Sequence, residues 1–273
     1  MDLIFFDLDG TLLNKASEIS PFTRDTLSLL NKNGIAYTVA TGRTMLSAKG
    51  ILDGHDFELP HIYNNGVTIW HPKAQQLSFE NLLDNSEIAA ILDVALGQGI
   101  TPFVNAIDSE HHHFIFHPLP RHQVEKDLVE KYFSRTKAKI FGLEALTQNS
   151  QVTNISMIGD AKVITKMWQE LNANPNLIAY SGPALEGENF RWMDVHHRLA
   201  SKGSAVINLK QQLGASNIIC FGDSDNDVSM FELADESYAP ANAKPAIKAL
   251  ASQVIGDHHE DGIARFLRER FSL

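Results

Sequence analysis

The chain has 273 residues, and its 23 basic and 33 acidic side chains give a formal net charge of −10 with histidine neutral. Hydrophobic residues make up 44% and charged residues 21%, which suits one large or two ordinary domains and excludes global disorder. Because the chain is acidic and has no basic stripe, we expect no nucleic-acid partner.

The chain begins with a short apolar run between two acids rather than with a basic region and a long apolar stretch, so we predict no signal peptide. No apolar segment approaches the roughly 20 residues that cross a bilayer, and we expect no membrane partner. The single cysteine, Cys220, lies in an apolar context and is expected to be a buried strand residue. These features favour a cytoplasmic protein.

Strand, helix and strand alternate at the start of the chain. The apolar run Leu3–Phe6 is typical of a strand buried on both faces in a parallel sheet. Ser20 and Pro21 favour a helix start, and Gly34 favours its end. A second apolar run covers 35–40. Polar motifs follow both strands, at the edge where open α/β sheets bind ligands.

A third short strand is expected at 61–63, followed by a hairpin of strands 67–70 and 76–79. From about residue 82 the pattern changes to hairpins mixed with helices, which indicates an inserted α+β layer. Helices are expected there at 87–96, 121–133 and 162–171, and strands at 101–107, 113–116, 152–158, 177–180 and 190–195. The α/β pattern then resumes with a helix at 204–213, a buried strand at 217–221, and helices near 229–234 and 262–270.

Asp7 and Asp9 follow the first strand and precede Gly10 and Thr11. One carboxylate can attack a substrate while the other moves a proton. Gly10 permits a tight turn beside a ligand, and the Thr11 hydroxyl can hold a carboxylate or phosphate. A simple polar turn is the alternative interpretation.

A second acidic cluster, Asp223, Asp225 and Asp227 with Asn226 among them, follows another buried strand. Like charges at this density favour a bound cation, and Mg²⁺ prefers carboxylate oxygens. A solvated helix N-terminus, where acids are favourable, is the alternative.

Two further motifs are weaker when taken singly. Thr41-Gly42-Arg43 offers a hydroxyl and backbone amides to an anion at a helix start, although helix capping also explains it. Lys202 precedes a glycine and a helix, where a surface lysine is the simplest interpretation.

The histidine clusters 111–113 with 117, 196–197 and 258–259 are expected to be polar surface rather than metal sites. Adjacent residues on a strand point to opposite faces and therefore make poor joint ligands.

In this order, Asp7-Leu8-Asp9-Gly10-Thr11, Thr41-Gly42-Arg43, Lys202-Gly203 and Gly222-Asp223-Ser224-Asp225-Asn226-Asp227 resemble the motifs of the haloacid dehalogenase (HAD) superfamily of phosphohydrolases, and of its Cof-like subfamily. The resemblance covers essentially the whole chain. It implies an α/β fold, with a Rossmann-like doubly wound parallel sheet as the catalytic core (residues 1–81 and 191–273). Residues 82–190 would be an inserted α+β cap that selects the substrate.

The resemblance also implies roles for individual residues. Asp7 would be the nucleophile, Asp9 the general acid and base, and Thr41 and Lys202 would bind the transferring phosphoryl group. Mg²⁺ would be held by Asp7, the main-chain carbonyl of Asp9 and Asp223, and Asp227 would lie behind these ligands or pair with Lys202. The expected substrate-binding residues are Leu8, Gly10, Thr11, Gly42, Arg43, Asn65 and Asn226.

We therefore expect a Mg²⁺-dependent phosphatase that acts on a small-molecule phosphate ester of the sugar phosphate, pyridoxal phosphate or flavin mononucleotide class, through an aspartyl-phosphate. A sugar phosphomutase with the same nucleophile is one alternative. A phospho-acceptor or binding module without catalysis is another, although it needs neither Asp9 nor a large cap.

Overall fold

The computed structural model describes residues 1–273, except for the side chain of Arg135. The chain forms two compact units: unit 1 contains residues 1–80 and 201–273, and unit 2 contains residues 81–200. The return to unit 1 therefore comes later than the sequence predicted. Residues 191–197 belong to β11 (Phe190–His197), which pairs with β9 (Val152–Asp160) on one side and β10 (Leu177–Pro183) on the other, and these pairings place β11 in unit 2.

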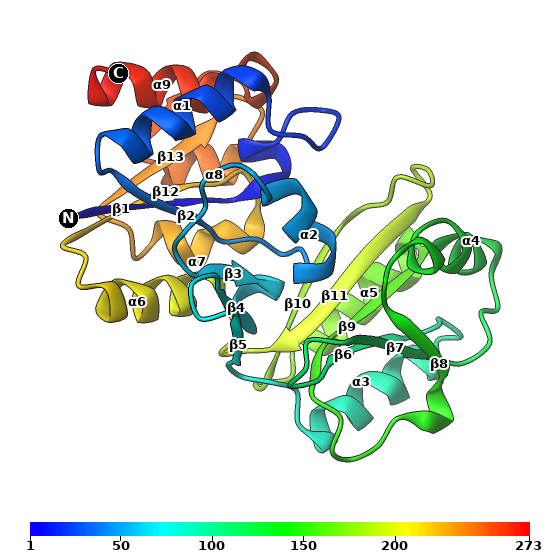
Figure 1. Cartoon of the computed structure of the whole chain (residues 1–273). Coiled ribbons are helices and arrows are strands. Elements are labelled where there is room, and N and C mark those ends of the chain that lie inside the picture. The colour runs from blue at the N-terminus through cyan, green and yellow to red at the C-terminus, as the bar shows by residue number, and fades with distance from the viewer. The chain divides into compact units, whose positions relative to one another are not determined.

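Unit 1 is built on a sheet of five parallel strands with β1 between β12 and β2 (Figure 1). The strand order is β14 (Gln253–Ile255), β13 (Glu236–Pro240), β12 (Asn217–Phe221), β1 (Asp2–Phe6), β2 (Ala36–Val39). Cys220 is fully buried in β12, as predicted.

Helices cover both faces of this sheet because alternate residues of β1 point to opposite sides. Leu3 and Phe5 pack in one apolar cluster with residues of three helices, α6 (Lys202–Leu213), α7 (Val228–Phe231) and α8 (Pro245–Leu250). Ile4 and Phe6 pack in another with residues of α1 (Pro21–Lys32), α2 (Met45–Leu52) and α9 (Gly262–Phe271). The predicted doubly wound α/β fold is confirmed.

A small antiparallel sheet completes unit 1. Its strands are β3 (His61–Tyr63), β4 (Thr68–His71) and β5 (Gln76–Phe79), in that order. The predicted hairpin is thus confirmed, and β3 joins it rather than the parallel sheet, which it meets only at the bridge between Ala40 and Ile62.

Unit 2 contains a six-stranded, mainly antiparallel sheet with three helices. The strand order is β10, β11, β9, β6 (Phe103–Ile107), β7 (His113–His117), β8 (Lys139–Gly142). Residues of α3 (Asn85–Gly97) and α5 (Ala161–Asn172) share one apolar cluster with the sheet, and α4 (Gln123–Lys131) is the third helix. This is the α+β layer that the sequence predicted.

Helices begin after residues whose side chains accept hydrogen bonds from the free backbone N–H groups of the first turn. The Ser20 hydroxyl accepts the N–H of Thr23 at 3.0 Å, with Pro21 in the first turn, as predicted. Helix α3 instead begins earlier than the expected residue 87, because Asp84 caps it and accepts the N–H groups of Ser86 and Glu87.

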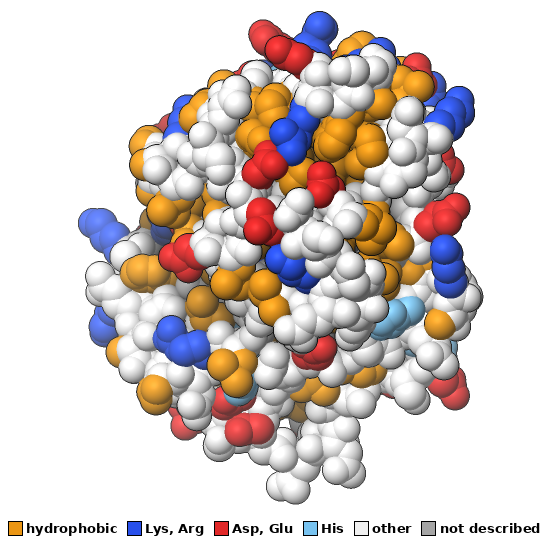
Figure 2. All heavy atoms as spheres, turned by 90° about the vertical axis from the view of Figure 1, so that its left-hand side faces the viewer, with side chains coloured by type: hydrophobic (Ala, Val, Ile, Leu, Met, Phe, Trp, Pro, Cys, Tyr) orange, Lys and Arg blue, Asp and Glu red, His pale blue; other side chains and the backbone are white. Residues whose placement is uncertain are grey.

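The surface carries charges of both signs. On the face shown in Figure 2, basic side chains are scattered among acidic ones. Among the described residues, no helix has both the length and the apolar character that a membrane span requires.

A glycine allows the turn after β3 to approach the start of α6. Gly66 has φ +102°, and a Cβ at this position would lie 2.4 Å from the main-chain oxygen of Ser201, the N-cap of α6. We expect Gly66→Ala to lower the free energy of unfolding by roughly 2–5 kcal/mol, from backbone strain and overpacking together.

Gly34→Ala is the matched control. Gly34 also has positive φ, but apart from its own atoms and those of its two chain neighbours, no atom of the described residues lies within 4 Å of the point that a Cβ would occupy there. This variant should cost only about 1–2 kcal/mol. Urea denaturation followed by circular dichroism measures both variants. If both variants lose the same free energy of unfolding, the close approach of Gly66 to α6 makes no contribution to the loss.

Candidate active site

Two acids meet at the carboxyl edge of the parallel sheet. Asp7 directly follows β1 and Asp223 follows β12, and these strands pair in register, Phe6 opposite Phe221. The N–H of Asp7 donates to the carbonyl of Phe221 at 2.9 Å. The pairing of the strands therefore brings together two side chains that are far apart in the sequence.

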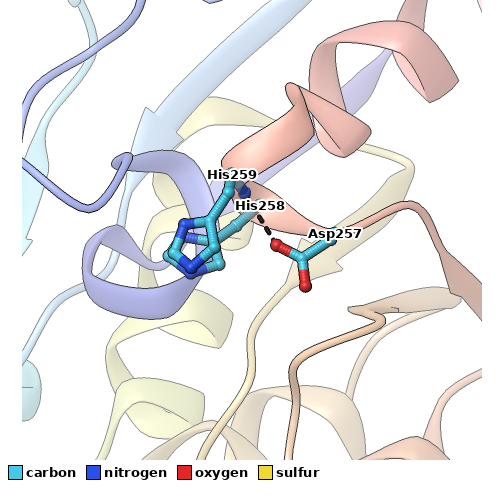
Figure 3. Close-up of side chains that lie close together, drawn as sticks. All are labelled: Asp257, His258 and His259. Atoms are coloured by element: carbon cyan, nitrogen blue, oxygen red, sulfur yellow. Dashed lines mark hydrogen bonds between the residues drawn. The ribbon is translucent and has the colours of Figure 1, made fainter.

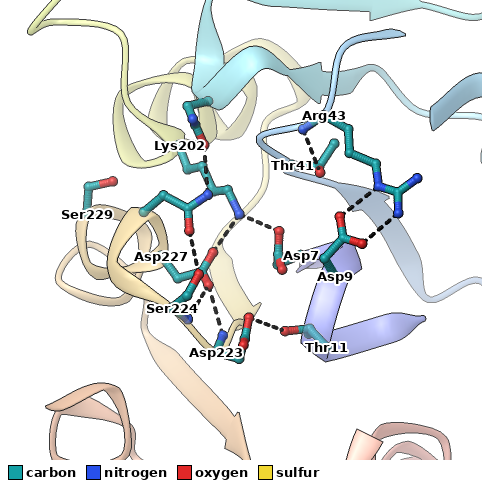
Figure 4. Close-up of polar contacts among 12 residues, drawn as sticks. Asp7, Asp9, Thr11, Thr41, Arg43, Lys202, Asp223, Ser224, Asp227 and Ser229 are labelled. Carbon is teal, nitrogen blue, oxygen red and sulfur yellow. Dashed lines mark hydrogen bonds and ion pairs between the residues drawn. The ribbon is translucent and has the colours of Figure 1, made fainter. Parts of the chain in front are cut away.

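The Lys202 ammonium lies between two buried carboxylates (Figure 4). Its Nζ is 2.5 Å from Oδ1 of Asp7 and 2.6 Å from Oδ1 of Asp227. Lys202 is the first residue of α6 and is fully buried, so the surface lysine considered from sequence is excluded. The next residue, Gly203, permits close packing: a Cβ there would lie 2.3 Å from the main-chain oxygen of Ser229.

Burial and charge shift the ionisation of this cluster. Burial works to lower the pKa of Lys202, but Asp227 and Asp7 outweigh it and the pKa is raised. Burial raises the pKa of Asp7 well above its ordinary value despite Lys202. Burial, followed by the charge of Asp227, raises the pKa of Asp223 to about 7. One ammonium therefore does not neutralise the three carboxylates.

Asp227 uses both of its oxygens within the protein. Oδ1 accepts from Lys202, and Oδ2 accepts the N–H groups of Asp223 at 2.8 Å and Ser224 at 2.9 Å. This carboxylate orients the lysine and the loop after β12, and its pair with Lys202 is one of the two arrangements that the resemblance implied for Asp227.

The carboxylates of Asp7, Asp223 and Asp227 offer ligand oxygens that lie within 4.8 Å of one another. The donor set is all oxygen and carries excess negative charge, so it fits a hard divalent cation. With Asp227 engaged elsewhere, Asp7 and Asp223 are the side chains that can hold the ion.

Gly10 and Thr11 fix the position of Asp223. Gly10 has φ +74°, and a Cβ there would lie 2.5 Å from Oδ2 of Asp223, so only glycine fits without displacing the carboxylate. The Thr11 hydroxyl donates to Oδ1 of Asp223 at 3.4 Å. Of the two partners considered from sequence, a carboxylate or a phosphate, Thr11 contacts the carboxylate.

Asp9 makes a bidentate ion pair with Arg43. Nε of Arg43 is 2.7 Å from Oδ2, and Nη2 is 2.6 Å from Oδ1. The side chain of Asp9 is 55% exposed, whereas that of Arg43 is 22% exposed. The hydrogen bond to Asp9 is the main cause that raises the pKa of Arg43. The interpretation from sequence assigned Arg43 to the substrate and did not foresee this pair.

Backbone hydrogen bonds join the loop after β2 to the turn after β3. The N–H groups of Asn65 and Asn64 donate to the carbonyls of Thr41 and Arg43, at 3.0 and 2.9 Å. Asn64 and Asn65 both have positive φ, 50° and 52°, a conformation that asparagine tolerates better than most residues. The Thr41 hydroxyl oxygen accepts the N–H of Arg43 at 3.1 Å.

The structure brings most of the expected substrate-binding residues to the same edge of the sheet. The Asn226 amide donates to Oδ1 of Asn65 at 2.9 Å, and a Cβ on Gly42 would lie within 3.4 Å of both side chains. Leu8 differs, because its side chain is fully buried in the apolar core and leaves only main-chain atoms for a ligand.

Two residues near this site, Asn242 and Lys244, were not predicted from the sequence. The Asn242 amide donates to the carbonyl of Gly10 at 2.8 Å. Nζ of Lys244 lies 2.7 Å from Oδ2 of Asp225. This exposed acid therefore pairs with a lysine and is not part of the cluster of Asp7, Asp223 and Asp227, called the cation cluster below. Both residues follow β13, so recognising this strand in the sequence would have placed them at the ligand-binding edge.

The sequence is similar to those of known phosphatases. A family model described as haloacid dehalogenase-like hydrolase matches residues 4–267. The 5-amino-6-(5-phospho-D-ribitylamino)uracil phosphatase of Bacillus subtilis is 28% identical, over 100% of this chain and 99% of the relative. The pyridoxal phosphate phosphatase of Escherichia coli is 24% identical, over 97% of each chain.

A solved structure has the same fold. The crystal structure of a haloacid dehalogenase-like hydrolase from Bacteroides thetaiotaomicron superposes with a TM-score of 0.77 at 23% identity and covers 99% of each chain. The predicted resemblance and the assignment as an enzyme are confirmed. With a family match that spans nearly its whole length, the chain belongs to the haloacid dehalogenase-like hydrolases.

Proposed function

We propose that this chain is a Mg²⁺-dependent phosphatase that hydrolyses a small phosphorylated metabolite through an aspartyl-phosphate. The observation that carries the proposal is the buried Lys202 ammonium, 2.5 Å from the Asp7 carboxylate at the end of β1. A carboxylate beside a cation is suited to attack an anionic phosphate ester, because the cation offsets their repulsion.

Asp7 is the nucleophile. Lys202 binds its Oδ1, so we assign the attack on phosphorus to Oδ2. A bond forms between Oδ2 and phosphorus while the bond from phosphorus to the leaving oxygen breaks. Water then attacks the phosphorus of the aspartyl-phosphate, which releases inorganic phosphate and restores Asp7.

Asp9 transfers the proton in both steps. It donates a proton to the leaving oxygen and later accepts one from the attacking water. Asp9 therefore carries the proton before the first step and is ionised between the two steps. The bidentate pair with Arg43 belongs to that ionised form and holds the carboxylate in one orientation to accept the proton of the water, so we assign Arg43 as a positioning residue for Asp9.

Two groups stabilise the transferring phosphoryl oxygens. Lys202 is pre-oriented by Asp227, and Thr41 accepts the N–H of Arg43, which leaves its hydroxyl hydrogen to donate to an anionic oxygen. Donors held in place before the substrate arrives need little rearrangement during the reaction.

Mg²⁺ would be held by the carboxylates of Asp7 and Asp223 and by the main-chain carbonyl of Asp9, and it would neutralise charge between nucleophile and substrate. The oxygen-only donor set and the raised pKa values of Asp7 and Asp223 support this assignment.

We assign the choice of substrate to unit 2, since every residue given a chemical role lies in unit 1. The B. subtilis and E. coli relatives are named for a phosphorylated ribitylaminouracil and for pyridoxal phosphate. Both names combine a nitrogen heterocycle with a phosphate ester, and esters of this kind, with sugar phosphates and flavin mononucleotide, form the panel to assay for phosphate release.

Asp7→Asn should abolish phosphate release, because an amide does not form the covalent intermediate. Asp9→Asn should lower kcat roughly 10²–10⁴-fold, the usual contribution of positioned proton transfer. Inorganic phosphate measured across the panel tests both variants, with circular dichroism to confirm folding. Substantial turnover by Asp7→Asn protein would refute the mechanism.

Arg43→Gln separates a positioning role from a substrate-binding role. If Arg43 orients Asp9, kcat falls, by less than in Asp9→Asn, and KM changes little. Arg43→Lys should restore only part of the loss, since an ammonium does not form the bidentate pair. A raised KM with unchanged kcat would instead assign Arg43 to the substrate.

Removing divalent cations should abolish activity, and Mg²⁺ should restore it. Asp223→Asn should need at least about tenfold more Mg²⁺ for half-maximal activity, as expected when a ligand carboxylate loses its charge. Asp225→Asn is the matched control: it lies two residues away, is exposed and pairs with Lys244, so its Mg²⁺ requirement should not change. Full activity in excess chelator would contradict the proposal.

A further inference from the structure

Two adjacent imidazole rings lie side by side in the turn η6 (His258–Glu260), which precedes α9. The ring centroids of His258 and His259 are 3.7 Å apart, and Figure 3 shows both rings on the same side of the backbone. The sequence expectation that neighbouring histidines diverge assumed a strand. This segment is a 3₁₀ turn, so the expectation was wrong for this pair.

A hydrogen bond fixes the orientation of His258. Its Nδ1 lies 2.7 Å from the carbonyl oxygen of Leu13, and since a carbonyl can only accept, Nδ1 carries the hydrogen. In the neutral ring, Nε2 then carries the lone pair. Metal-binding histidines are commonly held this way, with the second ring nitrogen donating to a carbonyl or carboxylate.

Asp257 adds an oxygen donor. Its carboxylate accepts the N–H of His259 at 2.9 Å, which fixes it at the start of the turn. One ligand atom from each of Asp257, His258 and His259 can be chosen so that all three lie within 4.8 Å of one another. The backbone N–H of His258 donates to Asn242, which restrains the segment further.

We propose that Asp257, His258 and His259 bind one divalent transition-metal ion of the Zn²⁺ class, in a site separate from the cation cluster of Asp7 and Asp223. Two imidazole nitrogens and one carboxylate oxygen, with water in the fourth position, form a donor set typical of Zn²⁺. At metal–ligand distances near 2.1 Å, ligand atoms lie about 3.4 Å apart, so a small rotation of the exposed His259 ring is required.

The donor chemistry distinguishes this site from the active site. Mg²⁺ binds hard oxygen ligands and disfavours imidazole, whereas Zn²⁺ and its neighbours accept nitrogen readily. Excess Mg²⁺ therefore fills the oxygen-only cluster and leaves the histidine site to a transition metal.

The site is also connected to the catalytic loop. His258 donates to Leu13, and Asn242 joins the N–H of His258 to the carbonyl of Gly10. An ion bound by His258 and His259 in the folded state holds this turn against the loop that follows Asp7, so it stabilises unit 1 by mass action.

The test is Zn²⁺ binding by the full-length protein in excess Mg²⁺, measured by competition with a chelating dye, with Co²⁺ absorption as a second readout. His259→Gln should weaken Zn²⁺ binding at least about tenfold, since even residues behind metal ligands contribute tenfold or more. His259 is exposed, so this variant should fold normally, and circular dichroism checks that it does.

His112→Gln is the matched control. His112 is also exposed and has a carboxylate partner, with Nδ1 3.1 Å from Asp108, but it lies in unit 2 and belongs to neither group of three ligand residues found among the described residues. Zn²⁺ affinity should not change in this variant. Asp223→Asn should likewise keep the Zn²⁺ affinity and the Co²⁺ spectrum.

Three outcomes would overturn the proposal. The first is the absence of stoichiometric Zn²⁺ binding in excess Mg²⁺. The second is equal binding by the unchanged protein and His259→Gln protein. The third is loss of the Co²⁺ signal in Asp223→Asn protein, which would place the ion in the active-site cluster. None of these depends on phosphatase activity, so the site and the proposed function are tested separately.

Discussion

The active-site half of this protein depends on one buried ammonium. Lys202 has no exposed surface, and its Nζ joins Asp7 at the end of β1 to Asp227 in the loop after β12. Burying ions costs several kcal/mol each, and removing one partner of such a group typically costs about 3–5 kcal/mol, because a charge is left uncompensated. The start of α6 is therefore tied to both strand ends, and Gly66 and Gly203 provide the close backbone approaches that this position requires.

The same interaction explains why the site suits a cation. Lys202 neutralises one charge among three neighbouring carboxylates, and burial, followed by the remaining repulsion between the carboxylates, raises the pKa values of Asp7 and Asp223. Asp227 turns both oxygens toward the protein, whereas Gly10 and Thr11 hold Asp223 toward Asp7. The arrangement that stabilises the lysine thus leaves an oxygen-lined, negatively charged position beside Asp7, where a divalent ion lowers the electrostatic energy.

The sequence predicted the motif positions well because they follow from local pattern. Buried parallel strands are continuous apolar runs, and polar residues at their carboxyl ends meet at one edge, which placed Asp7, Thr41 and Asp223 correctly. Partners across that edge are not encoded locally, so the pairing of Arg43 with Asp9 was missed. Strand β13 reads Glu-Ser-Tyr-Ala-Pro, which is not an apolar run, and Asn242 and Lys244 were missed with it. The unit boundary near residue 190 was misplaced because the pairing of β11 with β9 is long-range.

The loop after Asp7 shows how strand order positions a segment at the carboxyl edge of the sheet. Along the sheet, β12, β13 and β14 lie in sequence on one side of β1, and a residue following each contacts this loop. Asp223 accepts from Thr11, Asn242 donates to Gly10, and His258 donates to Leu13. Three successive strands thus supply three anchors, although only the first belongs to the cation cluster. Because Asn242 and His258 bind main-chain carbonyls of the loop, its path also depends on side chains outside the carboxylate cluster of Asp7, Asp223 and Asp227. Positioning of Asp9 and Asp7 is therefore a property of the whole carboxyl edge of the sheet.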